Sequence, residues 1–375
     1  IDPGYVIPDR LKWIYKSSLG WCGKAVDSIA DRLTFDRFDN DLLELNEIFR
    51  LNNPDILTDA AILGALIGSC SFVYIRLNNE GYPTLQVIDG SDATGDIDPV
   101  TGLLREGYAV LSRDDNDNVL MDAYFEPYRT TYYYDDGRVE VVESGIEYPL
   151  LVPVMYRPDS KRQFGHSRIT RACMSLQDKA CNVLTRADVT AEFYSFPQKW
   201  VSGTSPDAEP LDKWKASIAS ILEITKDADG DKPTFGQFVQ QSMNPHIDML
   251  RMYASAFCGE TDLILDDLGF VSGNPSSYEA IKASHEKLRL TTRKAQRKFG
   301  TCLLNVGFVA SCLRDGESYL RNRVSDIIPT WEPIFEPDAG TLSAIGDGAN
   351  KINQAIPGYF GKNNLERLTG IKADE

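Results

Sequence analysis

The feature that most constrains the fold is a row of apolar and small side chains spaced alternately four and three residues apart over residues 276–314. Steps of three and four residues return to one face of an α-helix, so the row predicts a single helix of roughly 55–60 Å. A chain of 375 residues with such a helix fits two or three domains, or one elongated subunit with protruding modules. The row consists of Ile281, His285, Leu288, Thr292, Ala295, Phe299, Cys302, Val306, Val309 and Leu313.

Two polar residues mark the start of this helix. Ser276 and Glu279 have the spacing of a capping box, in which the serine oxygen and the glutamate carboxylate each bond a free backbone N–H group. The preceding segment, residues 263–275, is rich in Gly, Asp and Pro, and Pro275 disfavours a helical conformation at Asn274. We therefore expect a loop there rather than a continuous helix.

The first part of the chain changes from a helical to a β pattern. Residues 5–50 are typical of helices, and residues 56–67 predict a helix that is largely buried. Between Ser71 and Tyr156, short runs rich in Val, Ile, Tyr and Phe predict a β-meander with hairpin turns. The turn segments that separate these runs are residues 78–81, 114–118 and 135–137.

Helical spacing returns from residue 167 to about residue 195. A short module follows over residues 196–240, with a strand, a helix that contains Trp214, and a second strand. Because another helix is expected over residues 241–262, the module is an excursion between two helices. Further along, the pattern predicts a strand near residues 324–331 and helices near residues 340–355 and 363–370.

Acidic residues outnumber basic ones by 55 to 39, which gives a net charge of −16. The molecule as a whole therefore repels phosphate, which disfavours an ordinary DNA-binding protein and is compatible with a pore through which DNA slides. The seven cysteines form no C-x-x-C pair, so we expect reduced thiols packed as small apolar groups. No apolar run reaches the ~18 residues of a membrane span. The start at Ile1 without a signal pattern indicates a chain trimmed at its beginning.

The sequence lacks the motifs of the common catalytic chemistries. Its three histidines, His166, His246 and His285, are far apart and none has metal-ligand spacing, and we expect His285 to be packed on its helix. Two G-x-x-G-K segments, at residues 20–24 and 358–362, are too short for a phosphate-binding loop. There is no G-x-S-x-G nucleophile elbow. We therefore expect no ATP hydrolysis, no cofactor and no enzymatic activity.

Aspartates gather in two predicted turns, and the first group is the strongest candidate for a catalytic site. Aligned carboxylates can hold Ca²⁺ or Mg²⁺ and activate water, so a metal-dependent hydrolase or nuclease is the alternative function. The calcium-loop pattern fails in both groups, because Pro99 and Val119 stand where glycine is required. Asp and Asn also favour hairpin turns through local hydrogen bonds, and we prefer that interpretation. The groups are Asp89, Asp92, Asp96 and Asp98, and Asp114, Asp115 and Asp117.

Basic residues dominate the first half of the long predicted helix, where only Glu279 and Glu286 oppose them. Such a band is either a solvated face or a surface that contacts DNA phosphates or the acidic surface of a neighbouring copy. We expect it on the exposed flank of the helix. The basic band consists of Lys282, Lys287, Arg289, Arg293, Lys294, Arg297 and Lys298. The residues of the same helix that we expect to be buried are Ile281, Leu288, Phe299 and Val306.

The order of these elements resembles that of the portal proteins of long-tailed phages. Residues 165–169 (GHSRI) and 196–203 (FPQKWVSG) resemble the family's passage from wing through stem into clip. Residues 266–270 (DDLGF) and 274–281 (NPSSYEAI) resemble its tunnel loop and the capped start of its long helix. The C-terminal residues that continue the resemblance are Trp331, Pro333 and the helix after Pro337.

The resemblance implies an α+β fold of the portal type, with a β-rich wing, a helical stem, a small α/β clip and a very long helix after a tunnel loop. The implied tunnel-loop residues are Leu265, Asp266, Asp267, Leu268, Gly269 and Phe270, and the implied clip residues are Lys199, Trp200 and Trp214. The implied domains are the N-terminal helices and β-rich wing (1–166), the stem helix (167–195), the clip module (196–240), the returning stem helix (241–262), the tunnel loop (263–275), the long wing helix (276–314) and a C-terminal wing or crown-side segment (315–375).

The same resemblance implies a structural protein of the virion. Portal subunits form a homo-oligomeric ring, usually dodecameric, at one capsid vertex, and its channel passes double-stranded DNA during packaging and ejection. The clip meets the terminase large subunit and later the head-completion adaptor, the wing meets capsid or scaffold protein, and a mobile tunnel loop projects into the channel. The expected location is the capsid vertex, with the host cytoplasm as the site of assembly, and neither a cofactor nor a membrane is implied.

Overall fold

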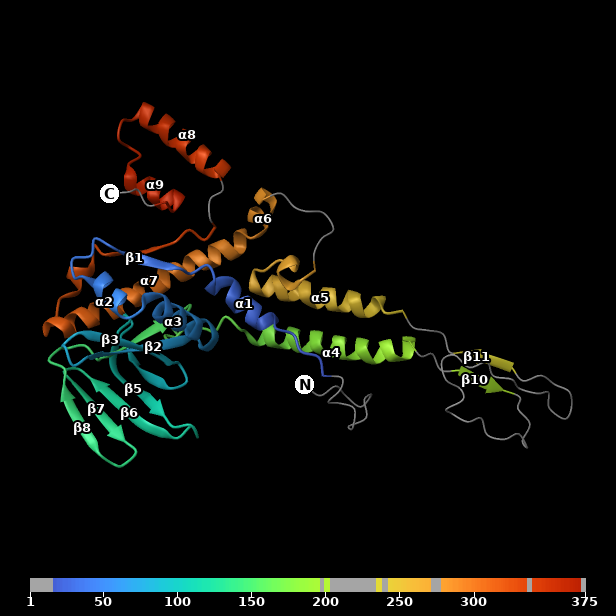
Figure 1. Ribbon diagram of the computed structural model, residues 1–375, viewed down its shortest axis with the longest axis horizontal. Coiled ribbons are helices and arrows are strands. Elements are labelled where there is room, and N and C mark those ends of the chain that lie inside the picture. Colours follow the sequence, from blue (N-terminus) through green and yellow to red (C-terminus); the bar gives the residue numbers. More distant parts are fainter. Residues whose placement is uncertain are drawn as a thin grey trace. The chain divides into compact units, whose positions relative to one another are not determined.

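Figure 1 shows the computed structural model, which describes residues 16–195, 199–202, 234–237, 242–270, 278–335 and 339–371. The chain divides into two compact units. The β-rich unit comprises residues 22–170 and 273–375, and the hairpin unit comprises residues 1–21 and 171–272. Both contain helices and strands, as the predicted α+β class requires.

A three-stranded antiparallel sheet forms the core of the β-rich unit. Its middle strand is buried over residues 70–75. On one face the Ser71 hydroxyl donates a hydrogen bond to the Ala61 carbonyl of helix α3 at 2.6 Å, and on the other Tyr74 contacts Phe125 of a second sheet with ring centroids 5.5 Å apart. Because both faces are covered, this strand carries a continuous apolar run. The strands in spatial order are β3 (Pro83–Asp89), β2 (Cys70–Leu77) and β9 (Leu151–Met155), and α3 spans Pro54–Gly68.

The second sheet is a five-stranded β-meander in which each strand pairs with the next (Figure 1). Gly137 in the last hairpin turn has φ +80°, a left-handed conformation that favours glycine. The hairpins predicted at residues 114–118 and 135–137 are confirmed. The prediction of a single meander over residues 71–156 is wrong. Strand β2 pairs with the distant strand β9, and both belong to the three-stranded sheet. The meander consists of β4 (Ala93–Ile97), β5 (Leu104–Arg113), β6 (Val119–Glu126), β7 (Arg129–Tyr134) and β8 (Val139–Glu143).

The N-terminal segment contains a strand where only helices were expected. Strand β1 (Phe35–Asp39) pairs antiparallel with β12 (Ile328–Trp331), and Phe35 lies opposite Trp331. The two rings meet edge-on with centroids 5.5 Å apart. The prediction of helices over the described part of residues 5–50 is therefore wrong at β1, because that strand depends on a partner far along the chain. The helices of this segment are α1 (Trp21–Ala30) and α2 (Leu45–Leu51).

The helix predicted over residues 276–314 is interrupted. Helix α6 (Tyr278–Ser284) ends at His285, whose φ of −91° and ψ of 10° leave helical geometry, and α7 (Glu286–Asp315) follows. His285 is 7% exposed and its ring lies 6.4 Å from that of Phe335. The prediction that His285 is a packed helix residue is confirmed for its burial, but the expected continuous helix is wrong because the chain bends at this residue.

The predicted core positions of the long helix are confirmed on α7 and wrong on α6. Leu288, Phe299 and Val306 are each 0% exposed, whereas Ile281 is 46% exposed. The break at His285 gives α6 a different direction from α7 (Figure 1). The apolar row therefore continues over the core only after the break.

The C-terminal helices form where the sequence predicts them. Helix α8 spans Ala339–Ala355 and α9 spans Lys362–Thr369. Gly370 caps α9 in the left-handed conformation with φ +69°, and a Cβ atom there would lie 2.6 Å from the Pro333 ring. A short 3-10 turn, η3 (Arg321–Val324), precedes β12.

The described residues of the hairpin unit form two long helices, a two-stranded ribbon and a 3-10 turn. The helices fall within the predicted ranges 167–195 and 241–262. The described elements are α4 (Arg171–Ser195), β10 (Lys199–Ser202), β11 (Thr234–Gln237), α5 (Asn244–Thr261) and η2 (Leu265–Leu268).

All seven cysteines are free thiols, and all except the half-buried Cys22 are buried. The prediction that the cysteines pack as small apolar groups is confirmed for the six buried residues. Among the residues that the structure describes, no helix has the length and apolar character needed to span a membrane.

Candidate functional site

Helices α4 and α5 pack against each other as an antiparallel hairpin, in the region that the sequence assigns to the stem. Near one end, the Thr190 hydroxyl and the His246 Nε2 atom lie 3.2 Å apart. Near the other end, the rings of Trp21 and Phe257 are 5.5 Å apart. Small side chains between these points allow the helices to approach closely. The small buried residues are Cys173, Ala180 and Cys181 of α4 and Ala254 and Cys258 of α5.

The predicted clip module begins and ends in a two-stranded antiparallel ribbon. Strands β10 and β11 pair from Lys199 opposite Gln237 to Ser202 opposite Thr234. Trp200 lies opposite Gly236. The two ends of the module therefore lie side by side, as expected for an excursion between two helices. Trp214 and the helix predicted around it lie outside the described residues.

The predicted tunnel loop begins as a tight turn directly after α5. The helix ends at Asp262, which adopts the left-handed conformation with φ +58°. The Asp267 carboxylate accepts a hydrogen bond from the Ile264 backbone N–H group at 2.9 Å, which closes the turn. Burial, with a smaller contribution from the nearby Asp267 charge, raises the pKa of the Cys258 thiol to about 11. The turn therefore folds back against α5.

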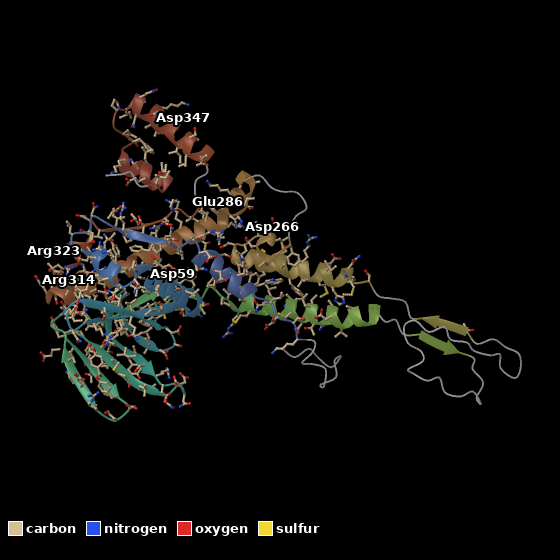
Figure 2. All side chains as sticks on the ribbon, in the orientation of Figure 1. Asp59, Asp266, Glu286, Arg314, Arg323 and Asp347 are labelled. Atoms are coloured by element: carbon tan, nitrogen blue, oxygen red, sulfur yellow. The ribbon has the colours of Figure 1, made fainter. Side chains whose placement is uncertain are left out.

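The turn leaves one carboxylate free to face solvent. Asp266 is exposed and Figure 2 shows it beside α5, whereas Leu265, Leu268 and Phe270 are half-buried. Gly269 has φ +87° and ends the 3-10 turn. Residues 271–277, which include the predicted cap residue Ser276, lie outside the described part of the chain, as does the side chain of Glu279.

The segment that leads into the hairpin joins several elements of the β-rich unit. Gly165 has φ +87°, and a Cβ atom there would lie 2.1 Å from the Tyr156 carbonyl oxygen, so only glycine fits. The Ser167 hydroxyl donates to the Ile67 carbonyl at 2.7 Å, and the Arg168 backbone N–H group donates to the Leu66 carbonyl at 2.8 Å. Residues 165–168, which carry part of the family resemblance, are therefore bonded to the end of α3 within the β-rich unit.

A hydrogen bond between two surface side chains stabilises the turn that contains Asp159. His166 Nε2 lies 2.7 Å from Asp159 Oδ2, and two backbone N–H groups also donate to the Asp159 carboxylate. The hydrogen bond with His166 is the main reason that the pKa of Asp159 is lowered to about 2. The histidine therefore serves a turn and is not placed as a metal ligand.

The first aspartate group is dispersed over a hairpin and its charges are bound locally. Asp89 accepts hydrogen bonds from the Ser91 hydroxyl and backbone, which lower its pKa. Asp92 forms an ion pair with Arg113 at 2.6 Å, and Arg105 lies between Asp96 and Asp98 at 3.5 and 3.4 Å. In the second group, the Asp114 carboxylate is also bound locally, because it accepts hydrogen bonds from the backbone N–H groups of Asn116 and Asn118 in the same turn. Within the described residues, no group of three or more His, Cys, Asp or Glu side chains could hold a metal ion.

Six of the seven residues of the predicted basic band lie on α7, and Lys282 lies on α6. Five side chains of the band are exposed, and Lys282 and Arg289 are half-buried. Arg289 is held by Glu286, which Figure 2 shows at the start of α7, with N–O distances of 2.7 Å. No acidic residue occurs between residues 287 and 314, so the rest of the band has no neutralising charge on its own helix. The exposed members are Lys287, Arg293, Lys294, Arg297 and Lys298.

One buried polar cluster was missed by sequence reasoning. Asn305 is 2% exposed in the middle of α7, donates to the Thr101 carbonyl at 3.2 Å and accepts from Arg321 at 2.7 Å. Burial lowers the pKa of Arg321, whose guanidinium also lies 5.4 Å from the Phe308 ring centroid. The signal that could have revealed it is an amide inside an otherwise apolar helical run. The cluster joins the β4–β5 turn to α7.

A family model described as "Phage portal protein, SPP1 Gp6-like" matches residues 16–350. The chain belongs to this family of phage portal proteins. The match includes the hairpin, the ribbon, the turn after α5 and α7.

Two curated relatives and two solved structures agree with this assignment. The portal proteins of Mycobacterium phages L5 and D29 are each 24% identical to the chain, over 376 and 377 residues, and each match covers 93% of the chain and 75% of the relative. The neck of a native gene transfer agent particle with C12 symmetry has a TM-score of 0.50 at 11% identity, covering 98% of this chain and 94% of the other. The virion of the native gene transfer agent gives 0.50 at 11% identity, with coverage of 99% and 96%. These structures share the fold.

Family membership implies an oligomeric ring in a phage particle, and thus a place in the virion capsid. It also implies a structural role, and the alternative of a metal-dependent hydrolase or nuclease finds no support.

Proposed function

We propose that this chain is the ring subunit through whose channel double-stranded DNA enters and leaves the capsid. The α4–α5 hairpin is the stem that lines the channel. The observation that carries the proposal is the family match over residues 16–350, a range that includes the hairpin and reaches into α8. The ring is dodecameric, as supported by the C12 symmetry of the gene transfer agent neck, and it assembles in the host cytoplasm. It moves DNA without catalysis of its own.

We assign a partner to each of the domains predicted from the sequence. Residues 196–240 are the clip, which binds the terminase large subunit and then the head-completion adaptor. Residues 1–166 and 276–375 are the wing and its continuation, which contact capsid or scaffold protein. The pairing of β10 with β11 supports a clip that is a separable insertion.

The turn after α5 is the start of the tunnel loop. The exposed Asp266 repeats around the ring as a circle of negative charge, which discourages adhesion of DNA phosphates. Leu265, Leu268 and Phe270 pack between neighbouring loops. Their half-buried state in a single subunit leaves apolar surface for that contact.

The clip assignment is tested by replacing residues 203–233 with Asn-Gly. Ser202 and Thr234 are cross-strand partners, so a two-residue hairpin turn closes the ribbon with native pairing. We expect rings of normal size in electron micrographs and complete loss of terminase binding in a pull-down. The matched control replaces the exposed turn residues 114–118 with Asn-Gly. Terminase binding by the clip variant, or unfolding of its hairpin, contradicts the assignment.

The tunnel loop is tested with the double variant Leu268→Ser and Phe270→Ser. Ring formation and packaged DNA are measured separately, and we expect intact rings with reduced packaging.

The absence of a metal requirement is tested with the double variant Asp96→Asn and Asp98→Asn. This variant should change the free energy of unfolding by no more than ~0.5 kcal/mol and leave ring assembly unchanged. Tight Ca²⁺ or Mg²⁺ binding that this variant loses would revive the hydrolase alternative.

A further inference from the structure

Strand β8, at the free edge of the five-stranded sheet, is exposed along its whole length (Figure 1). Its sequence is VEVVE, and the valines are 55%, 59% and 43% exposed in order. Exposed β-branched residues on an edge strand invite pairing with another chain, and proteins usually block such edges with Lys, Pro or a covering segment. Within the described residues nothing covers β8. The charges that guard this edge are therefore its two glutamates, which a basic partner would neutralise.

The backbone of β8 offers hydrogen-bonding groups at alternate positions. The Tyr134 N–H group donates to the Arg138 carbonyl at 3.0 Å before the strand, and the Ser144 N–H group donates to the Tyr128 carbonyl at 2.7 Å after it. Bonded and non-bonded pairs alternate in an antiparallel ladder, so even-numbered residues of β8 bond to β7. The N–H and C=O groups that point away from the sheet are those of Val139, Val141 and Glu143. These three positions also share one face of the strand.

The charge on this edge is not neutralised within the sheet. Glu143 lies opposite Arg129, but that guanidinium makes a two-point ion pair with Glu126 at 2.8 and 2.9 Å. The opposite edge differs, because Asp96 on β4 and Asp92 and Asp98 at its two ends are paired with arginines of β5. The face of β8 that carries Val139, Val141 and Glu143 therefore presents two valines followed by a carboxylate for which the described residues provide no ion pair.

We propose that β8 accepts an added β-strand from another virion protein, a segment with two apolar residues and a basic residue on alternate positions. Free backbone groups at three alternate residues select an extended chain rather than a helix. The valines select its apolar residues, and Glu143 selects its basic residue. A second copy of β8 fits less well, because antiparallel pairing centred on Val141 sets Glu143 of each strand opposite Val139 of the other and supplies no basic residue to the acidic edge. The inference rests on the proposed contact of the wing with capsid or scaffold protein and specifies its chemistry.

Residue-resolved hydrogen exchange on the full chain tests the proposal, first as purified protein and then in particles assembled with the other virion proteins. The amides of Glu140 and Val142 should be protected in both samples. The amides of Val139, Val141 and Glu143 should exchange quickly in the purified protein and at least about tenfold more slowly in particles. Equal exchange in the two samples overturns the proposal, and so does protection in purified rings, because the occupant is then a second copy.

Val141→Pro removes one outward N–H group and spares every bond to β7. It should abolish the protection of Val139 and Glu143 in particles and lower incorporation of the protein at least about tenfold relative to Val141→Thr. If the proline variant misfolds, the pair Val139→Lys and Val141→Lys blocks the edge without changing the backbone. Incorporation equal to that of the threonine control overturns the proposal. Ring formation by the unmodified chain in electron micrographs tests the proposed function separately.

Discussion

The two halves of helix α7 differ although one continuous helix contains both. In residues 286–298 only one stripe is buried, formed by Leu288, Thr292 and Ala295, and the opposite face is cationic. In residues 299–313 almost every side chain is buried. Period alone does not distinguish them, since the same spacing of apolar residues runs through both.

The difference arises from what surrounds each half. Around the second half, Phe299 stacks on Tyr156 with centroids 6.1 Å apart, Phe308 meets Tyr148 at 5.1 Å, and a Cβ atom at Gly307 would lie 3.1 Å from the Leu45 side chain. The first half has neighbours on one side only. One helix therefore begins at the surface and continues into the core. Substitutions at its buried positions should lower the free energy of unfolding much more than substitutions on its exposed face.

The largest expected effect is that of Phe299→Ala. The side chain is fully buried, so its removal leaves a cavity and should lower the free energy of unfolding by ~3–5 kcal/mol. The matched control is Lys298→Ala on the exposed face, which should change it by less than ~0.5 kcal/mol. Chemical denaturation of both proteins provides the measurement. Similar effects of the two substitutions would remove the contrast between the faces.

Asn305→Ala should have the next largest effect. It leaves Arg321 and the Thr101 carbonyl without a buried partner, which should cost ~1–3 kcal/mol. The control is Thr301→Ala, whose exposed hydroxyl bonds only a carbonyl of its own helix. If the two variants unfold at the same denaturant concentration, the polar cluster does not hold the second half of α7 in place.

High pH should destabilise the second half through its thiols. Burial raises the pKa of Cys302 and of Cys312 from 9.0 to about 11. The folded protein then keeps protons that the unfolded chain loses, so stability is full below pH 9 and falls as the pH rises to 11. The expected loss by about pH 11 is on the order of 2–3 kcal/mol for each thiol. A double variant with alanine at both positions should show a shallower decline, and an unchanged decline would contradict this account.

The smallest effect on stability is expected on the cationic face. Lys294→Glu combined with Arg297→Glu should change the free energy of unfolding by no more than ~0.5 kcal/mol, because both side chains are exposed. The same variant should alter assembly or DNA retention. Loss of rings in light scattering assigns the band to a neighbouring subunit, and intact rings with less retained DNA assign it to phosphate contacts. If neither ring formation nor DNA retention changes, the basic band is a solvated face with no partner.

Much of the candidate site was predictable because its signals are local. The apolar periods located α4, α5 and α7, and the Gly, Asp and Pro content of residues 263–275 located the turn that ends α5. Turn chemistry correctly explained Asp89, Asp98 and Asp114, since each of these carboxylates accepts a hydrogen bond from a residue two or three positions further along the chain. Local hydrogen bonds and helical spacing need no information from elsewhere in the chain.

The tertiary structure decided what depends on distant partners. The pairing of β1 with β12, the separation of β2 and β9 from the meander and the burial of Asn305 all join segments that are far apart in sequence. The break at His285, beside Phe335, and the exposure of Ile281 follow from such packing. Sequence period determines which face of a helix is apolar, but only the neighbouring segments determine whether that face and the others are covered.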